Sequence, residues 1–208
     1  MRILDTYIGI EPFTVKVDQS PELEALIEKA RELRQLPFAE KLAGVKELSI
    51  DALVNAYEEM LTGNVEAGNI VCNKYSLNHA LQEKLGCCRY QGALFFVLGY
   101  EAELGDKQFI SFAEVGNLNT VFNEVFEDGR AERVSIFTES LKNKDKYDYS
   151  KHANWKTEQV YPGLNFYSYQ KTPKGMVIVE NENRQVDMNF KVEPQESLDE
   201  AELLNIVQ

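Results

Sequence analysis

Histidine and cysteine, which carry much of enzyme chemistry, are scarce in this chain of 208 residues. The histidines are His79 and His152, and the cysteines are Cys72, Cys87 and Cys88. Their spacing matches no zinc-binding pattern, and three cysteines, two of them adjacent, do not form a disulfide framework. We therefore expect no metal, no cofactor and no structural disulfide, and we expect a reducing compartment such as the cytoplasm.

Long apolar runs are also missing. The longest extends from Ala93 to Leu98, far short of the roughly 20 residues that a helix needs to span a bilayer. Asp5 and Glu11 interrupt the first residues, which therefore do not have the apolar core of a cleavable signal peptide. We expect a soluble protein without membrane contact. Export without a cleaved signal would leave no such mark.

Basic residues are outnumbered. The chain has 22 lysines and arginines against 34 aspartates and glutamates, a formal net charge of −12. The lysines between residues 142 and 151 are interrupted by Asp145 and Asp148, so no continuous basic stripe forms. An acidic surface repels phosphate backbones and anionic membranes, and we expect no nucleic-acid partner. With 44% hydrophobic residues, the chain has enough apolar material for one globular domain.

Helical spacing dominates the first half of the chain. Ser20 stands where a helix N-cap is expected, and Gly86 stands where a C-cap is expected. Two further helices are expected to start at Ser49 and Ser76. Pro37 is expected to stop the first helix. The last helix is apolar on all sides, which predicts burial in the domain centre. The four predicted helices cover residues 21–36, 49–62, 76–85 and 88–104.

Strand-like alternation dominates the second half, after a first strand pair within residues 1–17. Asp128-Gly129 is a typical hairpin turn. The polar stretch 142–156 is expected to be a loop. The later strands are predicted at 109–115, 120–126, 133–137, 164–169, 175–180 and about 185–192. Helices followed by an antiparallel meander predict an α+β fold.

One domain is expected to cover residues 1–192, followed by an acidic C-terminal helix or tail over 193–208. A capping box at Ser197 favours the helix. This segment would pack on the body of the domain or be available to a partner groove. Both possibilities stay open at the level of the sequence.

Cys88 is the strongest candidate for a functional residue. It follows Gly86-Cys87 and begins the apolar helix. A helix N-terminus presents unpaired N–H groups and a partial positive charge, and both favour a thiolate. The residue is therefore a nucleophile or a small buried side chain at a helix start.

The order of elements and several short motifs resemble the transglutaminase-like branch of the papain-like cysteine superfamily. Gly86-Cys87-Cys88-Arg89 is similar to the family's Gly-x-Cys motif, which carries the nucleophile at the start of the core helix, so Cys88 is the matching cysteine. Residues 120–129, Thr-Val-Phe-Asn-Glu-Val-Phe-Glu-Asp-Gly, are similar to its His-x-Trp-x-Glu-Val motif and the Asp-Gly hairpin that follows. The resemblance covers about residues 50–140, and 157–192 would be an added β region.

The resemblance implies a degenerate catalytic triad. Thr120 stands in the position of the family's histidine, Phe122 in that of its aromatic residue, and Phe137 or Thr138 in that of its aspartate. Acyl transfer by a thiol needs a base, and threonine is not one near neutral pH. The resemblance therefore implies a non-catalytic domain that binds a protein or peptide in the former substrate cleft, lined by Thr120, Phe122 and Arg89.

Two expectations follow for the geometry and chemistry of that cleft. The side chain of Thr120 should point toward Cys88, with Val121 and Asn123 on the opposite face of the strand. The helix dipole stabilises a charge by only about 0.3–1 kcal/mol, so the Cys88 thiol should stay mostly protonated, and Cys88→Ala should leave activity largely intact.

Two alternatives remain. In the first, the chain is a cysteine-dependent acyl transferase or amide hydrolase, with Cys88 as nucleophile and His152, beside Trp155, as a relocated base. His79 is expected to face solvent. In the second, the chain is a redox-sensitive protein that uses the Cys87-Cys88 pair.

Overall fold

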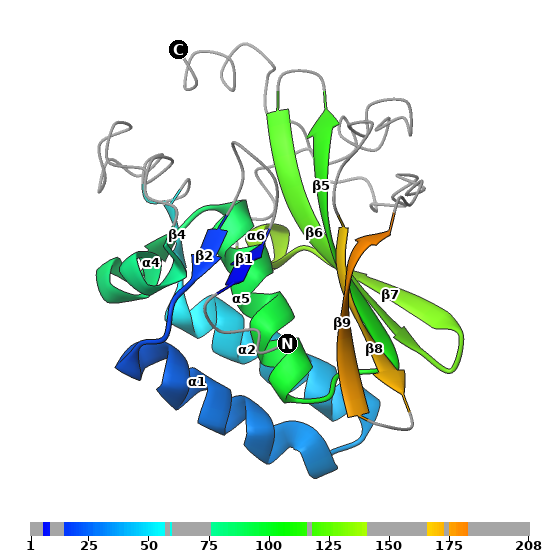
Figure 1. Ribbon diagram of the computed structural model, residues 1–208. Helices are drawn as coiled ribbons and strands as arrows, with labels where there is room; N and C mark the ends of the chain where they lie inside the picture. Colours follow the sequence, from blue (N-terminus) through cyan, green and yellow to red (C-terminus); the bar gives the residue numbers. More distant parts are fainter. Residues whose placement is uncertain are drawn as a thin grey trace.

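The computed structural model describes residues 6–8, 15–56, 59, 76–115, 118–140, 166–172 and 175–182. After a short strand pair, most of the helices precede the main antiparallel sheet, which confirms the expected α+β class. The elements are β1 (Thr6–Ile8), β2 (Val15–Val17), α1 (Pro21–Glu32), the 3-10 turn η1 (Leu33–Gln35), α2 (Phe38–Ala52), β3 (Val54–Asn55), α4 (Leu77–Glu83), β4 (Leu85–Gly86), α5 (Cys88–Glu101), β5 (Lys107–Val115), β6 (Leu118–Glu127), β7 (Arg130–Val134), α6 (Ile136–Glu139), β8 (Phe166–Thr172) and β9 (Gly175–Glu182) (Figure 1).

Among the described residues, the main sheet has five antiparallel strands in the order β7-β6-β5-β8-β9. β5 is the first of these strands in the sequence, yet it lies in the middle of the sheet between β6 and β8 (Figure 1). Asp128 and Gly129 join β6 to β7, and both have positive φ angles of 50° and 75°. This conformation is that of a primed hairpin turn, so the predicted Asp-Gly turn is confirmed.

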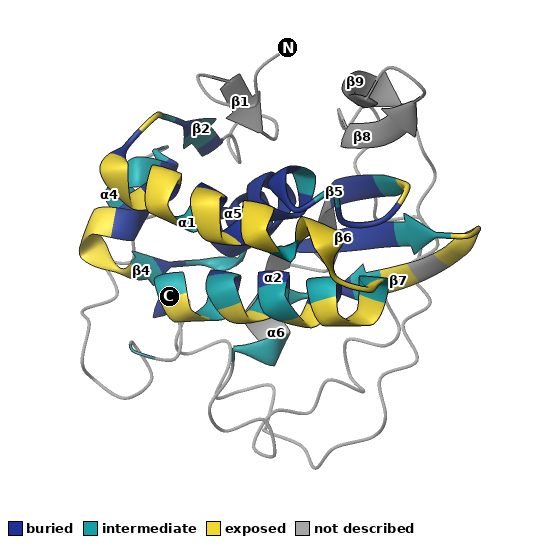
Figure 2. Cartoon of the chain, turned by 90° about the horizontal axis from the view of Figure 1, so that it is seen from below, coloured by how far each residue is buried: buried dark blue, intermediate teal, exposed yellow. Residues whose placement is uncertain are grey.

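α5 is the central element of the molecule. Its residues from Arg89 to Gly99 are all buried. It packs against α1 and α2 on one side and against β5 and β6 on the other (Figure 1). The outward faces of α1 and α2 are exposed, whereas α5 behind them is buried (Figure 2). The apolar character of this helix on all sides is therefore explained by contacts on all sides.

Gly92 allows α5 to lie close to the sheet. A Cβ atom at Gly92 would lie 2.6 Å from Val121 Cγ1 of β6, closer than real Cβ contacts. The amide Nδ2 of Asn123 also donates to the Gly92 carbonyl oxygen at 3.2 Å. A larger residue would push the helix away from β6, so this glycine sets the spacing at the start of α5.

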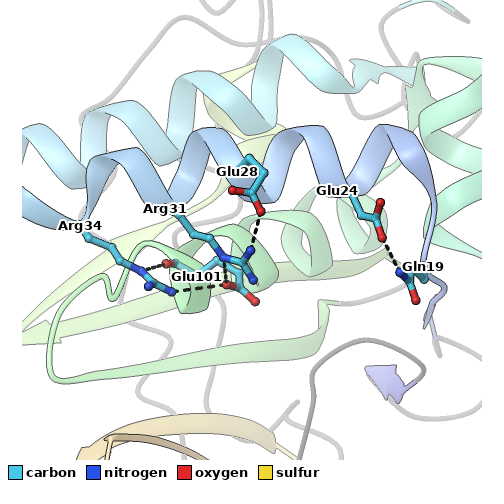
Figure 3. A network of polar contacts seen from close by, with 6 residues as sticks. All are labelled: Gln19, Glu24, Glu28, Arg31, Arg34 and Glu101. Carbon is cyan, nitrogen blue, oxygen red and sulfur yellow. Dashed lines mark hydrogen bonds and ion pairs between the residues drawn. The ribbon is translucent and has the colours of Figure 1, made fainter.

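Charged side chains hold the other end of α5 (Figure 3). Arg31 Nε donates to Glu101 Oε2 at 2.8 Å, and Arg34 Nε donates to the Glu101 carbonyl oxygen at 2.7 Å. The hydrogen bond to Glu101 is the main cause that raises the pKa of Arg31. Cations near the last carbonyl groups of a helix stabilise it. This cluster ties α1 and η1 to the C-terminus of α5.

The predicted helix over residues 49–62 does not begin at Ser49, and β3 at Val54–Asn55 interrupts it. Ala56 and Glu59 are again helical, and residues 57–58 and 60–62 lie outside the described residues. α2 begins at Phe38, directly after Pro37, and ends at Ala52. Pro37 has an extended ψ of 154° and precedes the helix, where its missing N–H has no cost, so it starts α2 as well as ending the segment before it. Ser49 does not cap a helix, because its hydroxyl donates to the Val45 carbonyl oxygen at 2.8 Å inside α2.

Two smaller boundaries also differ from the prediction. The C-cap of α4 is Lys84, with φ of 53°, and not Gly86, because Gly86 pairs with Asn55 in the short parallel β3–β4 ladder. The strand predicted over 133–137 ends at Val134, and Phe137 belongs to α6. The predicted cap at Ser20 is confirmed, and so is the start of a helix at Ser76, which the structure shows to be an N-cap as well. Each hydroxyl oxygen accepts from a backbone N–H three residues on, at 3.2 and 3.3 Å.

The strands predicted over 164–169 and 175–180 correspond to β8 and β9, which pair as an antiparallel hairpin. The predicted loop at 142–156, the strand at 185–192 and the segment 193–208 lie outside the described residues. Within the described ranges, no helix has both the length and the apolar character needed to cross a bilayer.

Candidate functional site at the start of α5

Cys87 and Cys88 occupy the start of the central helix. Cys87 is the N-cap, and its carbonyl oxygen accepts from the N–H groups of Tyr90 and Gln91 at 3.0 and 3.1 Å. Cys88 is the first helical residue, and both cysteines are reduced and half-buried. The prediction that Cys88 begins a buried helix packed on an antiparallel sheet is confirmed.

Hydrogen-bond donors surround the thiol of Cys88. The Cys87 side chain hydrogen-bonds to it, the backbone N–H groups of Val121 and Arg89 donate to it, and the Arg89 charge lies nearby. The Cys87 bond, first, and then these other groups lower the pKa of the Cys88 thiol below its ordinary value, against burial, which raises it. The sequence-based expectation for the Cys88 thiolate included only the stabilisation by the helix dipole. The structure shows that these hydrogen-bond donors stabilise the thiolate as well.

The register of β6 differs from the expected one. Val121 and Asn123 were expected to face away from Cys88, but both contact Gly92 of α5. Because side chains alternate along a strand, a shift of one residue reverses the two faces. The expected orientation of Val121 and Asn123 is therefore wrong. The side chain of Thr120 lies outside the described part of the structure.

Phe122 lies on the face of β6 opposite Val121. Its ring is 1% exposed and lies under the guanidinium of Arg133, which is 5.2 Å from the ring centre. Arg133 also bonds to Glu124 at 3.0 Å. A cleft that contains both Phe122 and Cys88 stays a prediction.

Arg89 carries a buried positive charge beside the thiol. Only 6% of its surface is exposed, and its guanidinium carbon lies 5.1 Å from the centre of the Tyr90 ring. A cation in this position favours a negatively charged partner, because burial reduces screening by solvent. The start of α5 is therefore suited to an anion such as a thiolate.

A group of buried polar side chains lies next to this site, and sequence reasoning missed it. Gln91 Nε2 donates to the Leu53 carbonyl oxygen at 3.2 Å and to Ser140 Oγ at 3.3 Å. Asn55 Nδ2 donates to the same Ser140 oxygen at 3.2 Å. The signal in the sequence was Gln91, a polar residue within an otherwise apolar helix. Amides and a hydroxyl do not titrate near neutral pH, so this group joins β3, α5 and α6 without supplying a base.

Among the described residues, His79 is not one of the groups that shift the pKa of Cys88. His79 lies on α4, with Nε2 3.7 Å from Glu83 Oε1, and it is half-buried. His152 lies outside the described residues. Within the described ranges, the groups that shift the pKa of Cys88 include no histidine and no carboxylate, and no cluster of His, Cys, Asp and Glu side chains could hold a metal ion.

No protein-family model, curated protein or solved structure matches this chain. The expected resemblance to the transglutaminase-like superfamily therefore stays a prediction from the motifs and from the order of the elements.

Proposed function

We propose that this chain is a degenerate, non-catalytic transglutaminase-like domain that binds an extended protein or peptide segment beside the start of α5. One observation carries the proposal. The described groups around the Cys88 thiol are hydrogen-bond donors and a cation. The thiol keeps the position of a nucleophile at a helix start, whereas none of these neighbours takes up a proton near neutral pH.

The pairing of β6 supports binding of a peptide as an added strand. β5 pairs with β6 over residues 118–126, but β7 pairs only with residues 123–127. Among the described residues, the part of β6 from 118 to 122 is therefore paired on one side alone. The N–H of Val121 bonds to the Cys88 sulfur, so this edge meets the start of α5 at Val121, and no described strand pairs with it there. An extended peptide binds such an edge through main-chain hydrogen bonds.

Peptide binding tests this proposal. Peptides selected from a displayed random library would be synthesised, and their affinity for each variant would be measured by calorimetry. Asn119 is two residues from Val121 and presents its N–H at the same edge. Asn119→Pro removes that N–H and should weaken binding by about tenfold, the value of one good hydrogen bond. Asn119→Ala is the matched control and should bind like the wild type, as should Cys88→Ala.

Selection of no peptide, or equal affinity of the Asn119→Pro and Asn119→Ala proteins, would contradict strand addition at this edge. Circular dichroism of both variants checks that each is folded. Loss of binding in Cys88→Ala would make the thiol itself part of the recognition.

The lowered pKa of Cys88 favours a second candidate, a cysteine-dependent acyl transferase or amide hydrolase. In this function Cys88 is the nucleophile and His152 the base. If His152 is the base, it would stabilise the Cys88 thiolate further. The described donors around the sulfur stabilise the thiolate without His152.

The rate of Cys88 alkylation as a function of pH separates the two candidates. Because Cys87, Val121 and Arg89 stabilise the thiolate, we expect an apparent pKa below that of an ordinary thiol, about 8.5, in the Cys72→Ser/Cys87→Ala protein and lower still when Cys87 is present. The non-catalytic proposal predicts the same pKa after His152→Ala. If the shift disappears in His152→Ala, the enzyme is the better interpretation.

A further inference from the structure

Cys87 and Cys88 are adjacent thiols with unequal surroundings. The sulfur of Cys88 receives hydrogen bonds from Cys87 and from the backbone N–H groups of Val121 and Arg89. The side chain of Cys87 does not cap α5 and hydrogen-bonds to Cys88 instead. Both residues are half-buried, so a small molecule reaches them while a bulky one is hindered. This asymmetry gives the two thiols different chemical roles.

We propose that Cys88 is oxidised by hydroperoxides and that Cys87 converts the oxidised residue into a Cys87–Cys88 disulfide. In the first step the Cys88 thiolate attacks the peroxide oxygen. An S–O bond forms, the O–O bond breaks, and hydroxide or an alkoxide leaves. Cys88 becomes a sulfenic acid, and the peroxide is reduced.

In the second step Cys87 acts as the resolving thiol. Its sulfur attacks the Cys88 sulfur, an S–S bond forms and the S–O bond breaks. The hydroxyl group leaves as water with the proton that Cys87 loses. The hydrogen bond between the two side chains places the attacking sulfur beside its target.

The hydrogen-bond donors around Cys88 determine which cysteine reacts with the peroxide and which one resolves the sulfenic acid. The thiolate is the reactive form of cysteine, and the donors from β6 and from the first turn of α5 stabilise it on Cys88. The same N–H groups also suit the oxygen of a sulfenate. Cys87 donates its hydrogen bond to the Cys88 sulfur, which leaves Cys87 in the role of the resolving residue.

A disulfide between neighbours is strained and therefore reversible. Neighbouring Cα atoms are about 3.8 Å apart across a trans peptide, whereas disulfides usually join Cα atoms about 4.4–6.8 Å apart. Strained disulfides are more readily reduced and serve as labile, regulatory bonds. The inference does not depend on peptide binding, and either can fail without the other.

Mass spectrometry of a tryptic digest tests the proposal, because Lys84 and Arg89 bracket the pair. Residues 85–89 form one peptide with Cys87 and Cys88, and Cys72 falls in the separate peptide 47–74. After hydrogen peroxide treatment we expect the 85–89 peptide to lose two hydrogens and to recover them with dithiothreitol. A crosslink between the two peptides, or a Cys88 sulfinic acid without any disulfide, would overturn the proposal.

Two matched variants assign the roles. Cys87→Ser should stop disulfide formation and leave a Cys88 sulfenic acid that dimedone traps. Cys88→Ser should leave Cys87 unreacted under the same conditions. We also expect Cys88 to react with hydrogen peroxide several-fold faster in the folded protein than in the urea-unfolded protein. The larger thiolate fraction raises the rate, and the lower nucleophilicity of a more acidic thiol offsets part of that gain. Equal trapping in both variants, or equal rates in folded and unfolded protein, would show that the surroundings of Cys88 do not promote its reaction with peroxide.

Discussion

Gly105→Ala is expected to destabilise the protein by about 3 kcal/mol, whereas Gly129→Ala should cost only about 1 kcal/mol. Both glycines have nearly the same left-handed conformation, with φ of 73° and 75°. At Gly105 a Cβ atom would lie 2.3 Å from the Phe126 carbonyl oxygen. At Gly129 no atom would lie within 4 Å of it. The pair therefore separates a steric collision from the cost of the backbone conformation.

The collision at Gly105 cannot be relieved easily. The Phe126 carbonyl oxygen already accepts from the Asp106 N–H at 2.7 Å, and Asp106 Oδ2 accepts from the Asp128 N–H at 3.0 Å. These bonds hold the turn before β5 against the end of β6. Urea unfolding of the two variants measures the difference. Equal losses of stability would show that the turn can move away from β6.

Arg133→Met is expected to destabilise the protein by about 2–3 kcal/mol, below the 3–5 kcal/mol for breaking a fully buried pair. The Glu124 side chain is 4% exposed and its carboxylate lies 3.0 Å from Arg133, which is 21% exposed. Methionine keeps an apolar contact with the Phe122 ring but leaves the buried carboxylate without this cation. The midpoint of thermal or urea unfolding measures the loss.

Two controls make this prediction specific. Arg130 is exposed on the same strand, and Arg130→Met should change stability by less than about 0.5 kcal/mol. The double variant Glu124→Gln/Arg133→Met removes the charge with its partner and should recover most of the loss. If it is as unstable as Arg133→Met alone, the loss arises from packing on Phe122 rather than from the buried charge.

Local signals predicted the elements that depend on neighbours in the sequence. The cap at Ser20, the helix start at Ser76 and the turn at Asp128-Gly129 follow from side-chain chemistry within a few residues. The sequence did not predict that α2 starts after Pro37, because proline both ends and starts helices and only packing decides between the two. The position of β8 beside β5 joins residues that are far apart in the sequence, and no local pattern encodes such a pairing.

The candidate site also has features that the sequence predicted and features that it did not. The placement of Cys88 at a buried helix start depends on a glycine and an apolar run, and it was predictable. The orientation of Val121 and its hydrogen bond to Cys88 depend on how β6 registers against α5 across Gly92. A shift of one residue reverses a strand, and the Thr-Val-Phe-Asn sequence is equally compatible with both registers.

The central position of β5 has a consequence for biosynthesis. Ribosomes make a chain from its N-terminus, so β5, β6 and β7 emerge before β8, which pairs with the other side of β5 over Lys107–Ile110. Until residues 167–170 are made, that edge of β5 has no β8 beside it. An uncovered strand edge is a template for association with other chains. The nascent protein is therefore exposed to misassembly in the interval between synthesis of β5 and synthesis of β8, when most of the helical layer has already been made.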